Sequence, residues 1–196
     1  MEDRKVLNKF IKFESYKVHK VVSYAAIILL AVVARLIPHA PNFAPIGGLA
    51  LFSGANFKKK SALLIPLAAM FISDIFLGFH KTIPYVYVSF IIIALIGGLI
   101  KNNKWQSLLS ASLVSSVLFF LITNFGVWVT GSMYQKSLAG LIQSYGFGIP
   151  FFRNTLISDL FYTFSFFYGY RFLSNFISRK LELLKRVKTL SQNRKS

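Results

Sequence analysis

The sequence lacks cysteine and has few charged residues. Without cysteine, the chain can form neither a disulfide framework nor a thiolate metal site. Charged residues make up 15% of the 196 residues, with only 6 Asp and Glu, whereas a soluble domain carries about a quarter. Hydrophobic residues make up 55%, and 21 of them are Phe. This composition predicts an all-α, polytopic membrane protein.

The motifs of the common catalytic sites are also missing. No phosphate-binding loop of the Walker type occurs, so the chain itself is not expected to hydrolyse ATP. Neither HExxH nor GxSxG is found, and the histidines, His19, His39 and His80, are scattered. We therefore expect no enzyme activity, no cofactor and no metal site.

The charges that are present are mostly positive and lie beside apolar runs. The net charge of +17 could indicate nucleic acid binding, but Lys and Arg flank the apolar runs and gather at the two chain ends. That placement is typical of membrane topology signals. We expect the chain to contact a lipid bilayer and no nucleic acid.

Apolar runs long enough to approach a membrane span occur six times. With six crossings and both termini inside, the inner segments hold 19 of the 23 Lys and Arg residues, so the positive-inside rule favours this topology. The expected location is the inner (cytoplasmic) membrane of the cell. The six runs are 18–37, 43–57, 61–79, 83–100, 106–130 and 153–177.

Three parts of the chain follow from this topology. Residues 1–17 form a basic cytoplasmic arm before a first span that is expected to be retained, and 18–177 form the transmembrane domain. Residues 178–196 form a basic tail in which Leu181, Leu184 and Val187 recur at helical spacing. Such a tail is suited to anionic lipid, although a solvated tail without a partner is an equal alternative.

Polar residues inside the spans share one depth, near the extracytoplasmic face. An ionisable side chain within a membrane costs about 2.5 kcal/mol or more near the centre, so it is expected to line a cavity or to meet a partner. Their common depth predicts a substrate-binding pocket that opens outward. The residues are Arg35, Asn42, Asp74, Tyr85, Asn124, Trp128, Arg153, Asn154 and Asp159.

The charged residues suggest roles. Arg35 and Arg153 would hold an anionic group, while Asp74 and Asp159 would hold a cationic group or pair with the arginines. Alternatively, the arginines anchor the chain at the membrane interface and the carboxylates are structural partners. Trp and Tyr at this depth are also common as interface residues.

Two weaker patterns concern helix packing. Small residues four apart, such as Ala50 with Gly54 and Ala94 with Gly98, allow helix backbones to approach closely. The segments ISDIFLGF at 72–79 and ISDLFYTF at 157–164 are alike, and they suggest an inverted repeat of three plus three helices.

Four segments carry a resemblance to a known family. They are ARLIPHAPNFAPIGGLALFSGANF (34–57), PLAAMFISDIFLGFH (66–80), FFLITNFGVWVTGSMY (119–134) and GIPFFRNTLISDLFY (148–162). Over most of residues 20–175, the chain resembles a bacterial family of uncharacterised membrane transport proteins. That family is similar to the substrate-binding S components of energy-coupling factor (ECF) transporters.

The resemblance implies a six-helix bundle that captures a vitamin-like molecule or a metal ion outside. It also implies two kinds of partner, a transmembrane coupling subunit and cassette ATPases. The first span departs from the Ala-x-x-x-Ala docking pattern of several S components, because none of its alanines are four residues apart. Two alternatives remain: a stand-alone carrier coupled to protons through Asp74 or Asp159, and a membrane enzyme or assembly factor without transport.

Overall fold

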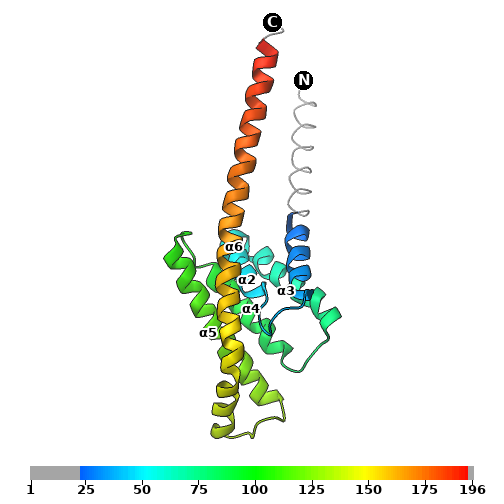
Figure 1. The fold of residues 1–196 in the computed structure, drawn as a ribbon, viewed down its shortest axis with the longest axis vertical. Helices are drawn as coiled ribbons and strands as arrows, with labels where there is room; N and C mark the ends of the chain where they lie inside the picture. The colour runs from blue at the N-terminus through cyan, green and yellow to red at the C-terminus, as the bar shows by residue number, and fades with distance from the viewer. Residues whose placement is uncertain (1–22, 194–196) are drawn as a thin grey trace.

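The computed structural model describes residues 23–193 and shows only helices, without strands, in that range. This confirms the all-α prediction. The predicted arm, residues 1–17, lies outside the described residues. The helices are Ser23–Leu36, α2 (Ile46–Asn56), α3 (Lys59–Leu77), α4 (Ile83–Gly97), α5 (Trp105–Thr130) and α6 (Leu138–Asn193), arranged as Figure 1 shows.

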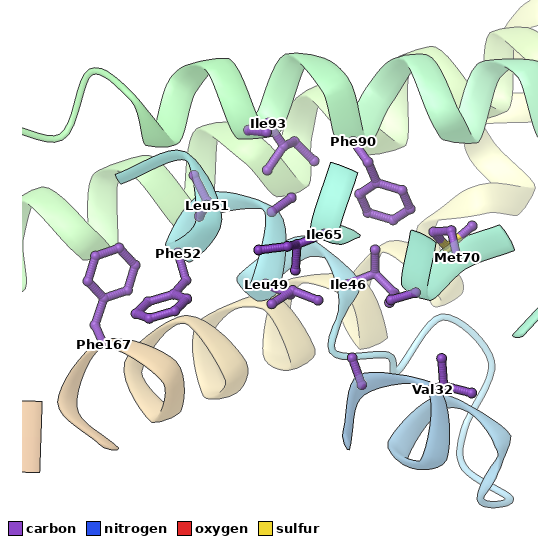
Figure 2. Packing of buried hydrophobic residues seen from close by; sticks show 14 of the residues in the cluster. Val32, Ile46, Leu49, Leu51, Phe52, Ile65, Met70, Phe90, Ile93 and Phe167 are labelled. Carbon is purple, nitrogen blue, oxygen red and sulfur yellow. The ribbon is translucent and has the colours of Figure 1, made fainter. Parts of the chain in front are cut away.

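The short helix α2 lies at the centre of the bundle. It contacts α3, α4, α5 and α6, and every residue from Ile46 to Ser53 is buried. Figure 2 shows Leu49 and Leu51 of α2 among side chains of the surrounding helices. A helix that is apolar on all sides lies either inside a protein core or in a membrane, and α2 lies inside the core. The position of α2 therefore explains why its sequence shows no polar face.

Glycines allow α2 to lie close to α4. A Cβ atom on Gly54 would collide with the main-chain oxygen of Ala94, and one on Gly97 would collide with that of Leu51. The predicted close approach at the Gly54 and Ala94 positions is therefore confirmed. Because both helices lack bulky side chains here, their backbones meet directly.

Two helices in the described part of the chain, α3 and α5, are long and apolar enough to cross a membrane. The helices Ser23–Leu36 and α4 are apolar but shorter, and α2 has 11 residues. At 1.5 Å per residue, 11 residues extend about 17 Å, compared with about 30 Å for the hydrocarbon core. Length and composition together therefore identify two of the six expected spans.

Helix α6 is much longer than the predicted last span. It begins at Leu138, whereas the sequence suggested about 153, and it contains Pro150 in its interior. Its contacts with α5 are the most extensive among the helices α2 to α6, and this packing stabilises a segment rich in glycine. The backbone stays helical through the predicted tail as far as Asn193, so α6 extends well beyond the bundle (Figure 1).

Candidate functional site

A cavity of about 670 Å³ lies at the end of the bundle where α3 and α5 end and α4 and α6 begin. Its lining comes from the connection between Ser23–Leu36 and α2, and from parts of α3, α4, α5 and α6. Drug-sized ligands occupy cavities of roughly 300–1,000 Å³. The cavity is therefore large enough for a small organic solute.

The connection that precedes α2, residues 37–45, forms one wall of the cavity and is fixed at both ends. At its start, Nη1 of Arg35 lies 2.7 Å from Oδ1 of Asp74 and also donates to the hydroxyl of Ser73. The hydroxyl of Tyr87 donates to the other oxygen of Asp74 at 3.0 Å. These contacts attach the end of the first helix to α3 and α4.

The far end of this connection is attached to α6. The hydroxyl of Ser158 donates to the main-chain oxygen of Ala44 at 2.8 Å, and Nδ2 of Asn154 donates to that of Pro41 at 2.9 Å. Main-chain groups outside regular secondary structure need such partners, because a buried polar group without a hydrogen bond destabilises the fold. The wall is therefore held by α3 on one side and by α6 on the other.

Asp159 lies at the inner end of the cavity, and its side chain is almost completely buried. Its exposed fraction is 4%, and its Oδ2 accepts a hydrogen bond of 2.7 Å from the hydroxyl of Ser116 on α5. The other carboxylate oxygen faces Gly47 so closely that a Cβ there would collide with it. Glycine at position 47 therefore makes room for the carboxylate.

Aromatic side chains cover the cavity walls between Asp159 and the opening. Phe119 and Phe120 lie one helical turn from Ser116 toward the opening. The rings of Phe120 and Phe152 are 4.8 Å apart, and those of Phe90 and Phe119 are 5.2 Å apart. These ring pairs give the cavity an apolar lining beside the carboxylate.

Four of the nine predicted site residues line this cavity, and they come from different elements. Arg35 ends the first helix, Asn42 lies in the connection, Asn124 is on α5 and Asp159 is on α6. The other five predicted residues lie outside the lining: Asp74, Tyr85, Trp128, Arg153 and Asn154.

The residues outside the lining have other surroundings. Asp74 is 1% exposed and pairs with Arg35, and Asn154 holds Pro41 as described above. The ring of Tyr85 packs against Gly126. The indole of Trp128 donates to the main-chain oxygen of Gln135 in the connection to α6. Within the described residues, the exposed Arg153 has no polar partner and does not line the cavity.

Sequence reasoning missed several residues that shape the site. Gly47 and Ser116 contact the key carboxylate, and Gly148 allows α6 to approach the side chain of Asn124. A small residue in an apolar helix gives no distinctive signal, because most such residues serve packing alone. Within the described residues, no group of three or more His, Cys, Asp or Glu could hold a metal ion.

Comparisons with known proteins place the chain in a family but provide no function. No curated protein and no solved structure matches it. Residues 16–182 match the profile of a family described as "Family of unknown function (DUF6580)", which covers most of the chain. The protein therefore belongs to this family of unknown function.

Proposed function

We propose that the protein is a membrane transport protein that captures a small solute at the extracytoplasmic face of the inner membrane. In this proposal six segments cross the bilayer, and both termini are cytoplasmic. The bound solute is transferred without chemical conversion.

The surface of the described bundle supports insertion in a membrane. Large apolar side chains are exposed along the helices, including Phe76 at 70%, Leu64 at 64% and Leu95 at 54%. The apolar windows of α3 and α5 are only 39% and 22% buried, whereas the core helix of a soluble protein is mostly buried. Exposed apolar surface on this scale indicates contact with lipid or with a protein partner.

The observation that carries solute capture is the cavity, which has a buried carboxylate at its inner end. The opening of the cavity is formed by the connections that contain His39, His80 and Tyr134. In the six-span topology favoured by the Lys and Arg distribution, these connections are extracytoplasmic. Toward the opposite end of the bundle, Ile93, Leu108 and Phe167 are buried. Access to the cavity from the extracytoplasmic side is therefore expected.

For energy coupling, we propose that the chain is the substrate-binding S component of an ECF-type importer. The resemblance to that class and the absence of a phosphate-binding loop from the sequence support this arrangement. A transmembrane coupling subunit and cassette ATPases would then complete the importer. A docking mode without the Ala-x-x-x-Ala pattern would be needed.

Native mass spectrometry of the purified full-length protein tests solute capture. We expect a population with one small molecule bound, of a size that a 670 Å³ cavity can hold. The control is Asp159→Asn, which keeps the side-chain shape and is expected to lose the bound molecule. Repeated detection of lipid alone, with no small molecule in either protein, would contradict the proposal.

A second candidate is a stand-alone carrier coupled to protons, and Asp159 favours it. The carboxylate is buried beside the cavity, whereas Asp74 is occupied by Arg35. Once native mass spectrometry has identified a solute, proteoliposomes that contain this chain alone separate the two candidates. Accumulation driven by a pH gradient favours the carrier, and its absence favours the S component.

A further inference from the structure

The charges around the cavity do not balance. Arg35 is the only Lys or Arg that lines it, and its guanidinium already pairs with Asp74 at 2.7 Å. The main-chain oxygen of Met70 lies 3.3 Å from the same nitrogen. Because Asp74 compensates its charge, Arg35 has little attraction left for an anionic solute.

Asp159 has no comparable partner within the described residues. Only the neutral hydroxyl of Ser116 bonds to it, and the structure shows no Lys or Arg in ion-pair contact with it there. The first turn of α2, at Gly47, offers a helix N-terminus, which is equivalent to roughly +0.5 charge. The inner end of the cavity therefore remains negative when Asp159 is ionised.

The walls next to this carboxylate are aromatic. Phe119 and Phe120 line the cavity one helical turn from Ser116, and Phe152 lines it two turns from Asp159. The faces of aromatic rings attract cations, and quaternary ammonium groups are recognised in this way. A metal ion would instead need several oxygen or nitrogen ligands in place of rings.

We propose that the solute is a small organic monocation, with an ammonium or quaternary nitrogen directed at Asp159 and an apolar body between the rings. This inference rests on the proposed function and narrows it to a substrate class. It assigns Arg35 to holding the cavity wall, so an anionic solute is excluded.

Binding of simple probes to the full-length protein in lipid nanodiscs tests the charge preference. The probes are benzyltrimethylammonium, uncharged benzyl alcohol and anionic phenylacetate. Binding of each probe is measured as the change in the melting temperature of the protein. We expect the cation to raise the melting temperature and the other two to have little effect. A larger shift with phenylacetate or benzyl alcohol would overturn the proposal.

Three variants connect the effect to the cavity. Asp159→Asn should weaken binding of benzyltrimethylammonium by about tenfold or more, equivalent to at least 1.4 kcal/mol. Phe152→Leu should weaken binding of benzyltrimethylammonium several-fold. This second variant still tests the site if Asp159→Asn does not fold. Phe125→Leu is the matched control, because Phe125 is 41% exposed and outside the lining. If all three variants bind benzyltrimethylammonium with equal affinity, the proposed binding site is wrong.

The result also separates this inference from solute capture itself. A neutral or anionic molecule found in the purified protein by native mass spectrometry would leave capture intact and would overturn the cationic class. If no molecule co-purifies and none of the three probes binds, both proposals fail.

Discussion

Arg35 and Asp74 are 39 residues apart in the sequence, and their side chains form an ion pair of 2.7 Å beside the cavity. Ser73 and Asp74 of α3 thus bind Arg35 at the end of the first helix, while Ser158 of α6 bonds to Ala44 and Asp159 faces Gly47 of α2. The two Ser-Asp pairs occupy the like positions of ISDIFLGF and ISDLFYTF. The two pairs have different partners, since one binds the side chain of Arg35 and the other the main chain of Ala44 and the hydroxyl of Ser116.

Asp74→Asn should destabilise the protein, because it leaves the guanidinium of Arg35 without a counter-charge. Breaking a buried ion pair from one side costs about 3 kcal/mol or more. Thermal unfolding in detergent, followed by circular dichroism, measures the loss. The double variant Arg35→Met with Asp74→Asn should recover part of it, since no charge is then unpaired. A single variant as stable as wild type would show that the pair contributes little.

Gly54→Ala should destabilise the contact between α2 and α4. The added Cβ would collide with the main-chain oxygen of Ala94, and overpacking of this kind costs about 1–3 kcal/mol. Gly146→Ala is the control, because nothing lies within 4 Å of its Cβ position. Alanine is the better helix former by up to about 1 kcal/mol, so the control should unfold at the same or a higher temperature. The reverse order of melting temperatures would contradict this packing.

Ser158→Ala should loosen the connection before α2 without changing the fold. Removing its 2.8 Å hydrogen bond to Ala44 costs about 1 kcal/mol, because the carbonyl loses a partner. Hydrogen exchange followed by mass spectrometry should show faster exchange across residues 37–49. The exposed Ser165, also on α6, provides the control Ser165→Ala, which should not alter exchange there. Equal exchange in the two variants would show that the bond does not restrain this wall.

Single cysteines test the six-span topology against a chain that has no cysteine of its own. Lys81→Cys and Ser132→Cys should react with an impermeant maleimide in intact cells, whereas Lys59→Cys should react only after the membrane is permeabilised. All three positions are exposed in the structure, so accessibility within the bundle does not confound the comparison. Labelling of position 59 in intact cells would remove the six-span arrangement.

Charged residues within apolar runs could be identified from the sequence, but the residues that they contact could not. Asp159 and Arg35 could be identified as site candidates because a charged group in an apolar run needs a reason. The partner of Arg35 was not determined, since a pair 39 residues apart depends on how three helices pack. Ser116 gave no signal, because a serine within an apolar helix usually bonds to its own backbone.

The boundaries of α6 were the least predictable part of the fold. The apolar run began only near residue 153, and the segment before it contains Gly140, Gly148 and Pro150. Glycine and proline weaken isolated helices. In the structure, Gly140 and Gly148 are buried, and a Cβ at position 148 would collide with Asn124 of α5. Tertiary contacts therefore decide this segment, and a single sequence does not contain them.

Because α6 is one continuous helix, it connects the cavity at Asp159 to the opposite end of the bundle. From Asp159 the helix continues for 34 residues to Asn193, a distance of about 51 Å at 1.5 Å per residue. If α6 tilted as a rigid rod by about 10° around Asp159, its end would move by roughly 9 Å. A small tilt of α6 at the cavity would thus be enlarged into a much larger displacement at the far end of the helix.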